Sequence, residues 1–599
     1  MSRKPTDPGD ELDPAAHVKA WIGLVERLQR ATMGAVGDDG QPNSFTVPDP
    51  SVIFGAFARW GGFVAEEPDK LFAAQMKLWQ DSFTLWQHGW NRMLGQEAAP
   101  LFQPERADRR FKDETWDESP AFDLIKQSYL MYARWLHETV DELGGPDAHT
   151  HHMVRFYTQE FIDALSPTNF AATNPAVLKA TADSKGKNLL KGLEHLVEDV
   201  ERGHGQLAIR MTDENAFEVG ENVAVTPGKI VYQNRLMQLI QYAPSTDTVY
   251  RRPLLIVPPW INKYYILDLG PRNSAIKWLV DQGLTLFVVS WINPDENYAE
   301  TRFEDYMLSG ALEAMCQIEK ETGEDTVNIV GYCIGGTLTA ALLAYLAAKG
   351  QSPVTSATFL TSMLDFEEPG DLGVFIDQEQ LDLIESHMDE RGFLEGRHMS
   401  RVFNLLRAND LIWSFVVNNY LLGREPFPFD LLYWNADSTR MPAEMHKFYL
   451  RTMYQHNLLR EPGAIELDGI PIDLGLVTVP SYFLSTREDH IAPWKSTYRG
   501  TQLLGGSCRF VLAASGHIAG VINPPVANKY CYWTRQGCPA DPDRWLANAT
   551  ETAGSWWPHW ARWLARHSGG KVPARQPGAG GLTPLEDAPG SYVKVRLAD

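Results

Sequence analysis

The segment of residues 327–349 constrains the fold of this chain more than any other. It reads VNIVGYCIGGTLTAALLAYLAAK: a β-rich run, a glycine-rich turn and a long apolar run. A short apolar run before a tight turn is typical of a buried strand, and the second run has the length of a helix. The glycines Gly331, Gly335 and Gly336 leave room where a strand and a helix meet closely. The segment therefore predicts a strand–turn–helix unit with Cys333 at its turn.

Further continuous apolar runs alternate with helical stretches from about residue 220 onward. Such runs are typical of parallel strands that helices cover on both faces. The insert of residues 365–474 is rich in Leu, Trp, Tyr and Phe, and it is long enough to form a cap over the carboxyl edge of the sheet. We therefore expect an α/β fold with a cap insertion. The predicted strands are Pro253–Pro259, Leu284–Trp291, Val327–Cys333, Ser356–Ser362, Val479–Ser485 and Arg509–Ser515.

The pattern of the chain predicts three regions. Residues 1–205 are mostly helical in pattern. Residues 206–567 hold the predicted sheet together with the cap insert. Residues 568–599 are rich in Gly and Pro, which predicts a flexible C-terminal tail.

One helix of the N-terminal region carries a stripe of large apolar side chains. Its members recur at alternating spacings of four and three, which places them on one face of a helix. We expect this stripe to be a core face within the region; a surface that faces a dimer, a partner or a polymer is the alternative. The stripe consists of Phe72, Met76, Trp79, Phe83, Trp86 and Trp90.

Charge and cysteine content exclude several classes of function. A formal net charge of −22 disfavours nucleic-acid binding, because a phosphate backbone would be repelled over most of the surface. Five scattered cysteines without a Cys-x-x-Cys pair predict neither a disulfide framework nor a zinc site, and we expect no metal. The N-terminus lacks an apolar signal region, and the longest apolar run is shorter than the ~20 residues of a membrane span. We expect a soluble protein of a reducing cytoplasm, without a transmembrane segment.

The turn GYCIGG has the form of a nucleophile elbow, the G-x-S-x-G turn between a strand and a helix, with Cys333 in place of serine. A buried structural cysteine is the alternative interpretation. A nucleophile on this kind of sheet needs an acid and then a histidine, in that chain order. Asp489 follows the fifth predicted strand and His517 follows the sixth, so both occur in that order. Glu488 is a rival acid and His490 a rival base.

An oxyanion hole would complete such a site. One donor is expected to be the backbone N–H of Ile334, the residue after the nucleophile. The other is expected from the loop PPWINKYYILDL, where the N–H of Ile261 is the candidate. If the register of this loop shifts by one residue, the N–H of Trp260 or of Asn262 would take the place of the Ile261 N–H. An ordinary turn stiffened by proline is the alternative for this loop.

Long motifs of this chain resemble those of polyhydroxyalkanoate synthases, most closely the class I, single-subunit type. The resemblance extends from about residue 105 to the C-terminus. It implies an α/β-hydrolase fold with a large cap insertion, preceded by a mostly helical N-terminal region. The motifs are DRRFKDETW (Asp108–Trp116), LSPTNFAATNP (Leu165–Pro175), ENAFEVGENVAVTPG (Glu214–Gly228), VPPWINKYYILDL (Val257–Leu269), SWINPD (Ser290–Asp295), GYCIGG (Gly331–Gly336), NDLIWSFVVNNYLLG (Asn409–Gly423), FDLLYWNAD (Phe429–Asp437), TREDHIAPW (Thr486–Trp494), ASGHIAGVINPP (Ala514–Pro525), GSWWPHW (Gly554–Trp560) and PGSYVK (Pro589–Lys594).

The resemblance implies an activity and a set of residue roles. Such enzymes polymerise 3-hydroxyacyl-coenzyme A, usually 3-hydroxybutyryl-coenzyme A in class I, into storage polyester at the surface of cytoplasmic granules. Cys333 would be the nucleophile, His517 the base and Asp489 the third member of the triad. We expect no cofactor, since coenzyme A is part of the substrate. The resemblance also implies a homodimer, with granule-associated proteins as further partners. Residues 1–205 would make the dimer, granule or partner contacts. Side chains expected near the substrate are Asn262, Tyr264, His490 and Trp434.

A thiol nucleophile suits this chemistry for a physical reason. A cysteine that attacks a thioester forms another thioester, so the acyl group stays activated until a hydroxyl attacks it. Serine would form an oxygen ester and release much of that driving force earlier. Two rival functions are a cysteine-triad hydrolase or depolymerase that uses water as acceptor, and a granule-coating protein with a vestigial site.

Overall fold

The computed structural model describes residues 14–33, 49–96, 98–105 and 108–596. These residues form two compact units, and each is described by itself. The helical unit combines the chain up to Asp213 with Arg407–Phe427. The sheet unit combines Glu214–Leu406 with Pro428–Ala598. Part of the predicted cap insert, Arg407–Phe427, therefore belongs to the helical unit.

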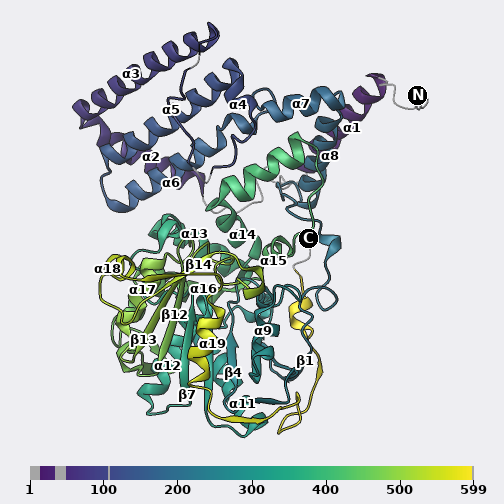
Figure 1. Cartoon of the computed structure of the whole chain (residues 1–599), viewed down its shortest axis with the longest axis vertical. Coiled ribbons are helices and arrows are strands. Elements are labelled where there is room, and N and C mark those ends of the chain that lie inside the picture. The colour runs from purple at the N-terminus through teal and green to yellow at the C-terminus, as the bar shows by residue number, and fades with distance from the viewer. Residues whose placement is uncertain (1–13, 34–48, 97, 106–107, 597–599) are drawn as a thin grey trace. The chain divides into compact units, whose positions relative to one another are not determined.

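The sheet unit is built on one large mixed sheet (Figure 1). Among the described residues its strand order is β15-β14-β13-β12-β7-β6-β4-β5-β2-β1-β17. The strands are β1 (Gly228–Gln233), β2 (Met237–Tyr242), β4 (Leu254–Val257), β5 (Leu286–Trp291), β6 (Val327–Tyr332), β7 (Val354–Leu360), β12 (Ser481–Thr486), β13 (Cys508–Ala513), β14 (Cys531–Thr534), β15 (Thr550–Ala553) and β17 (Glu586–Asp587).

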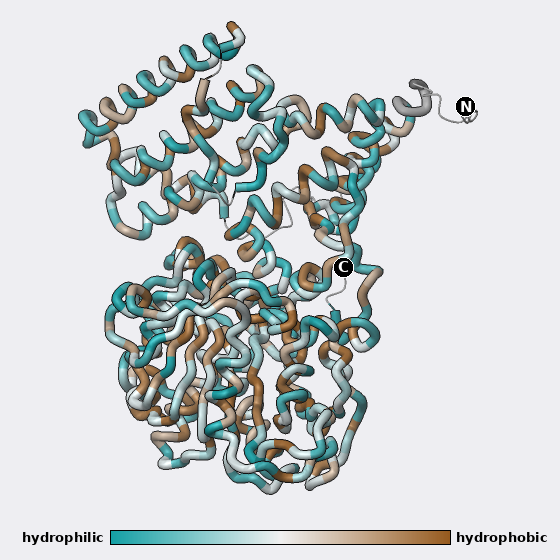
Figure 2. Tube along the Cα trace, in the orientation of Figure 1, coloured by the Kyte–Doolittle hydropathy of each residue, from teal (hydrophilic) through white to brown (hydrophobic). Residues whose placement is uncertain are grey.

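The centre of the sheet is parallel, as the continuous apolar runs predict. Strands β5, β4, β6, β7, β12 and β13 pair in parallel with one another in that order. Every residue of β4, β5, β6 and β12 is buried. Figure 2 shows hydrophobic stretches along the strands of this unit. All six predicted strands are present, and the α/β fold class is confirmed. The antiparallel outer strands have no comparable apolar signal in the sequence.

Helices flank this sheet, and α12 is the most deeply buried of them (Figure 1). All residues from Ile334 to Leu346 are buried, because the helix is apolar on every side and follows directly from a central strand. The helices of the unit are α9 (Ala275–Asp281), α10 (Phe303–Asp305), α11 (Glu313–Thr322), α12 (Ile334–Ala348), α13 (Gln378–Arg391), α14 (Gly396–Leu405), α15 (Asp430–Ala436), α16 (Ala443–Phe448), α17 (Trp494–Leu503), α18 (Pro542–Ala547) and α19 (Trp557–Ala565).

The helical unit contains eight α-helices among its described residues and two π-helical turns from the insert. The side chain of Asn188 donates to the carbonyl of Leu421 at 2.8 Å, and the Tyr420 hydroxyl donates to Asp199 at 2.7 Å. These buried bonds tie Arg407–Phe427 to α8. The elements are α1 (Pro14–Met33), α2 (Pro50–Ala65), α3 (Pro68–Met93), α4 (Thr115–Glu118), α5 (Pro120–Leu143), α6 (Ala148–Ala164), α7 (Pro175–Ser184), α8 (Lys187–Arg202), η8 (Asn409–Trp413) and η9 (Val416–Leu421).

The prediction that the aromatic stripe of α3 is a core face is wrong. All six of its side chains are exposed, from 42% for Met76 to 68% for Phe72. The helix instead packs through Ala74, Leu85 and Gly89 on another face, where small residues permit a close approach to α5. Periodicity located the apolar face correctly but could not show that the chain leaves it uncovered.

The prediction of a flexible C-terminal tail is also wrong. Strand β16 (Lys571–Pro573) pairs with β3 (Thr248–Tyr250), and β17 pairs with β1. The glycines here serve close approach rather than flexibility, since a Cβ on Gly580 would lie 1.7 Å from the carbonyl oxygen of Glu321. Composition alone does not distinguish these two uses of glycine.

The described helices include none that combines the length and the apolar composition of a membrane-crossing segment.

Candidate active site

Cys333 lies at the turn between β6 and α12, with φ 53° and ψ −125°. A positive φ is unfavourable for a residue with a Cβ, so the surroundings must hold this turn. The backbone N–H of Cys333 donates to the carbonyl of Leu360 at the end of β7, at 2.9 Å. The side chain is partly buried. The strand–turn–helix unit predicted from residues 327–349 is therefore present.

The glycines of this turn are required by close packing. A Cβ on Gly331 would lie 2.3 Å from the Cα of Gly336. A Cβ on Gly335 would lie 2.2 Å from the carbonyl oxygen of Val257, at the end of β4. Both distances are far shorter than any real contact of a Cβ, so larger residues would push the strand, the helix or the neighbouring loop aside.

His517 and Asp489 form a buried pair. The Nδ1 atom of His517 lies 2.8 Å from Oδ2 of Asp489, and the two residues are only 7% and 8% exposed. The same oxygen accepts a hydrogen bond from the Thr486 hydroxyl at 3.0 Å. The other oxygen accepts from the backbone N–H groups of Ile491 and Ala492, at 2.9 and 2.8 Å. The carboxylate is thus fixed in one orientation toward the imidazole.

The charges around His517 favour its protonated form. Burial lowers the pKa of His517, but the charges and hydrogen bonds of Asp489 and Cys333 outweigh burial and raise that pKa to about 10. Because Nδ1 faces Asp489, Nε2 is the ring nitrogen left for the sulfur of Cys333. The imidazole therefore links the carboxylate to the thiol. The Tyr332 ring stacks on that imidazole, with ring centroids 5.8 Å apart.

The rival acid and base are less buried than this pair. Glu488 is exposed, and its backbone N–H donates to the carbonyl of Ser515 at 3.0 Å. His490 is partly exposed and directly follows Asp489. The structure brings together Cys333, His517 and Asp489.

Two tyrosines that the sequence did not single out lie close to Cys333. Burial raises the pKa of Tyr449 and of Tyr454. The negative charge of Cys333 raises both values further, and for Tyr449 the neighbouring Tyr454 does so as well. Both belong to the π-helical turn η10 (Tyr449–Gln455) of the insert, and their ring centroids are 5.3 Å apart. The Phe366 ring lies 4.9 Å from Tyr454. The insert is rich in aromatic residues, and nothing in their spacing marks these three.

The loop of the candidate oxyanion donor Ile261 begins against the elbow, through the contact of Gly335 with Val257. Its far end is held by the insert. The Trp434 indole donates to the carbonyl of Lys263 at 2.7 Å, and the Lys263 ammonium lies 2.6 Å from a carboxylate oxygen of Asp437. Both members of this ion pair are buried. Trp434 therefore holds this loop in place.

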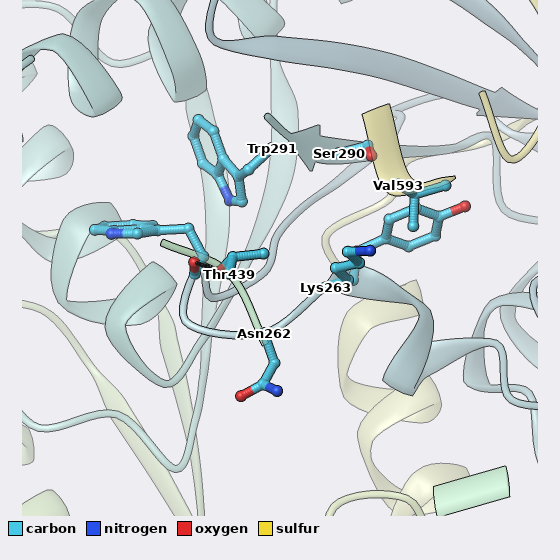
Figure 3. Close-up of a pocket in the computed structure, with 8 residues that line it drawn as sticks. Asn262, Lys263, Ser290, Trp291, Thr439 and Val593 are labelled. Atoms are coloured by element: carbon cyan, nitrogen blue, oxygen red, sulfur yellow. Dashed lines mark hydrogen bonds between the residues drawn. The ribbon is translucent and has the colours of Figure 1, made fainter. Parts of the chain in front are cut away.

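A small cavity lies beside this loop, and two other residues that were expected near the substrate are part of its lining (Figure 3). The cavity measures about 10 Å³, and Asn262, Tyr264 and Ser290 are among its lining residues. Tyr264 is only 2% exposed, and burial raises its pKa. Figure 3 shows the Asn262 side chain pointing away from Trp291 and Ser290. The first N–H of α12, on Ile334, has no partner within the helix, as at any helix start.

The described part of the chain holds no group of three or more His, Cys, Asp or Glu residues that could bind a metal ion.

Comparison with known proteins identifies the family. Residues 107–279 match the model of the poly-beta-hydroxybutyrate polymerase N-terminus, and residues 254–524 match that of the alpha/beta hydrolase fold. The chain is 51% identical to the poly(3-hydroxyalkanoate) polymerase of Methylorubrum extorquens, over 89% of this chain and 88% of that protein. The chain belongs to the poly(3-hydroxyalkanoate) polymerase family. This polymerase is therefore an acyltransferase on an α/β-hydrolase fold, and the predicted family, enzyme class and fold are confirmed.

Other members of the family are also similar along nearly their whole length. The poly(3-hydroxyalkanoate) polymerase subunit of Rhizobium meliloti is 49% identical, over 99% of this chain and 97% of that protein. The subunit of Cupriavidus necator is 43% identical, over 88% of this chain and 89% of that protein. The similarity to these relatives thus covers both units of the polymerase.

Proposed function

We propose that this polymerase joins (R)-3-hydroxyacyl groups from coenzyme A thioesters into polyester and releases coenzyme A. The expected monomer is 3-hydroxybutyryl-coenzyme A. The observation that carries the proposal is the arrangement of Cys333, His517 and Asp489. A thiol stands on a strained turn beside an imidazole whose pKa responds to it, and a fixed carboxylate orients that imidazole. The names of the relatives supply the class of polymer.

The first step is acylation of Cys333. His517 takes the thiol proton, and the thiolate attacks the carbonyl carbon of the substrate thioester. The tetrahedral intermediate then expels the coenzyme A thiolate, which receives the proton held by His517. The products are an acyl-cysteine thioester and free coenzyme A. Asp489 stabilises the imidazolium that forms, as its effect on the pKa of His517 indicates.

The second step is attack by a hydroxyl. The 3-hydroxyl of another hydroxyacyl group loses its proton to neutral His517 and attacks the Cys333 thioester. An oxygen ester forms, and the cysteine leaves as a thiolate that regains the proton. Acylation removes the negative charge of Cys333, which is one of the causes of the raised pKa of His517. The imidazolium is therefore less favoured in the acyl-enzyme than in the thiolate form, so the imidazole is free to accept the hydroxyl proton.

The oxyanion that forms in both steps needs fixed donors. We assign this role to the backbone N–H groups of Ile334 and Ile261. Ile334 is the first residue of α12, where the helix dipole also favours negative charge. Ile261 lies in the loop that begins against Gly335.

Water must be kept from the acyl-enzyme, since hydrolysis would yield free hydroxy acid. Tyr449 and Tyr454, whose pKa values respond to Cys333, pack with Phe366 in an aromatic cluster that suits this purpose. We also propose that the polymerase works as a homodimer at the granule surface, with granule-associated proteins as partners. No cofactor is needed in this scheme, because coenzyme A enters as part of the substrate.

The test measures coenzyme A release from 3-hydroxybutyryl-coenzyme A and examines the product. Wild type should release thiol and form insoluble polyester. Cys333→Ala should do neither, while Cys316→Ala, which changes an exposed thiol elsewhere, should resemble wild type. Thiol release with only soluble hydroxy acid would contradict the proposal, because water would then be the acceptor. Polymer formation by Cys333→Ala would overturn the assigned nucleophile.

A further inference from the structure

The loop of residues 258–263 contains no helix and, apart from an isolated antiparallel bridge of Asn262 with Ser438, no strand pairing, yet four of its carbonyl groups are fixed by other elements. At its start, the Trp291 indole of β5 donates to the carbonyl of Pro258 at 2.9 Å. At its end, the Trp434 indole of α15 donates to the carbonyl of Lys263 at 2.7 Å. Between these points, the carbonyls of Trp260 and Ile261 are both held by a single residue.

That residue is Thr439, which lies in the insert and is 3% exposed. Its backbone N–H donates to the carbonyl of Ile261 at 3.1 Å. Its hydroxyl donates to the carbonyl of Trp260 in a close contact. Figure 3 shows Thr439 beside the loop that carries Asn262. One buried side chain and its own backbone thus set two consecutive peptide groups of this loop.

Because the peptide group is planar, these two hydrogen bonds also fix the directions of the N–H groups of the loop. A trans peptide is planar, and its C=O and N–H bonds point in opposite directions. The carbonyl of Trp260 belongs to the same peptide group as the N–H of Ile261. Because that carbonyl points at Thr439, the N–H of Ile261 points away from Thr439. The same argument directs the N–H of Asn262 away from Thr439.

The loop also starts beside the helix that follows the nucleophile. A Cβ on Gly335, two residues after Cys333, would lie 2.2 Å from the carbonyl oxygen of Val257 and 2.8 Å from that of Pro258. The start of the loop therefore contacts the first turn of α12. The direction of its N–H groups is set within a few residues of this contact.

The segment that carries Thr439 is itself anchored to the loop. The Lys263 ammonium and the Asp437 carboxylate form a buried ion pair at 2.6 Å. The other Asp437 oxygen accepts from the Tyr265 hydroxyl at 2.9 Å. A buried ion pair with a further hydrogen bond fixes geometry strongly, because breaking it leaves an uncompensated charge.

We propose that Thr439 is a positioning residue for the oxyanion hole: its hydroxyl orients the Trp260–Ile261 peptide so that the Ile261 N–H serves as the second donor. This inference rests on the proposed function of Cys333. It assigns to the insert a part in transition-state stabilisation, exerted through the loop that Thr439 orients.

The test compares Thr439→Val, which lacks the hydroxyl but keeps the shape and the backbone N–H, with Thr439→Ser, which keeps both polar groups. Single-turnover release of coenzyme A from 3-hydroxybutyryl-coenzyme A measures acylation. Loss of one oxyanion donor lowers kcat by roughly 10²–10³-fold, so misdirection of one donor should slow acylation by roughly 10- to 100-fold. The KM should change by less than about twofold, since the donor acts on the transition state. Thr439→Ser should stay within about threefold of wild type.

A second readout separates positioning from general damage. A ketone analogue, in which CH₂ replaces the thioester sulfur, forms a tetrahedral adduct with Cys333, whereas a thioether analogue without the carbonyl oxygen does not. Thr439→Val should weaken binding of the ketone and leave binding of the thioether unchanged. Should Thr439→Val not fold, Thr439→Ala is measured with the same pair of ligands.

Each outcome has one meaning. Wild-type acylation by folded Thr439→Val, beside an inactive Cys333→Ala, would overturn the positioning role and leave the proposed function intact. An equal loss of binding for both analogues would also overturn it. Activity in Cys333→Ala would instead refute the proposed function itself.

Discussion

At the scale of single residues, the chemistry depends on how little freedom the side chains have. The two carboxylate oxygens of Asp489 accept hydrogen bonds from four donors in total. The carboxylate can therefore face His517 in only one way. Cys333 keeps a backbone conformation that is costly for any residue with a Cβ, which the surrounding strand and helix enforce. The site is therefore organised before substrate arrives, and small changes at these positions should have large effects on rate.

Asp489→Asn should lower kcat by roughly 10³–10⁴-fold, because an amide cannot hold the imidazole in the required orientation and charge state. Coenzyme A release measures the effect. Glu488→Gln is the matched control, since its side chain is exposed and adjacent in sequence. It should stay within about threefold of wild type. A larger loss in Glu488→Gln than in Asp489→Asn would reassign the acid.

The raised pKa of His517 predicts a specific dependence of stability on pH. Because that pKa rises from 6.5 to about 10, the folded protein holds this proton more tightly than the unfolded chain. The stabilisation is complete below about pH 6.5 and is lost as the pH rises through about 10. Urea unfolding of wild type and His517→Gln should show a difference in free energy of unfolding that falls by at most ~1.4 kcal/mol per pH unit in this window.

A difference between these two proteins that stays constant or grows from pH 6.5 to 10 would contradict the assignment of the shift to His517.

At the scale of elements, strands and helices that are buried on all sides could be predicted from the sequence. Elements with one exposed face were predicted less well. The central strands and α12 were predictable because they are apolar throughout. The proximity of Cys333, Asp489 and His517 was predictable because each follows a strand of the parallel sheet. The exposed face of α3 and the ordered C-terminal segment were not, since both depend on partners distant in sequence. Tyr449 and Tyr454 needed the fold as well, because only the path of the insert brings them to Cys333.

The orientation of α3 can be tested by a matched pair on one helix. Leu85→Ala removes a side chain that is 6% exposed and should destabilise the helical unit by about 2–5 kcal/mol. Trp86→Ala removes a larger side chain that is 61% exposed and should change stability by no more than about 0.5 kcal/mol. Thermal unfolding measures both. A loss of stability in Trp86→Ala that exceeds this limit would show that the stripe is covered in solution.

At the scale of the whole molecule, the insert contributes to both units. Its segment Arg407–Phe427 belongs to the helical unit, where hydrogen bonds to α8 hold it. Another part of the same insert carries Tyr449 and Thr439 to the site. The helical unit therefore holds one segment of the insert, and the segments that carry Tyr449 and Thr439 belong to the sheet unit.

This connection predicts how a truncated chain behaves. A chain of residues 214–599 alone should be poorly stable, because it lacks Asn188 and Asp199. These are the hydrogen-bond partners of Leu421 and Tyr420. Replacement of residues 407–427 by a Gly/Ser linker should restore a cooperative unfolding transition. Limited proteolysis measures both: cleavage should fall within 407–427 in the first protein. Full resistance to cleavage there would contradict the division into units.

The thioester mechanism is tested most directly by mass spectrometry of the wild-type polymerase, quenched in acid shortly after it is mixed with 3-hydroxybutyryl-coenzyme A. The peptide containing Cys333 should gain the mass of hydroxybutyryl groups, and hydroxylamine should remove them as expected for a thioester. The Cys333→Ala protein should gain none. Modification of another residue, or polymer formation without any acylated Cys333, would contradict the covalent thioester mechanism.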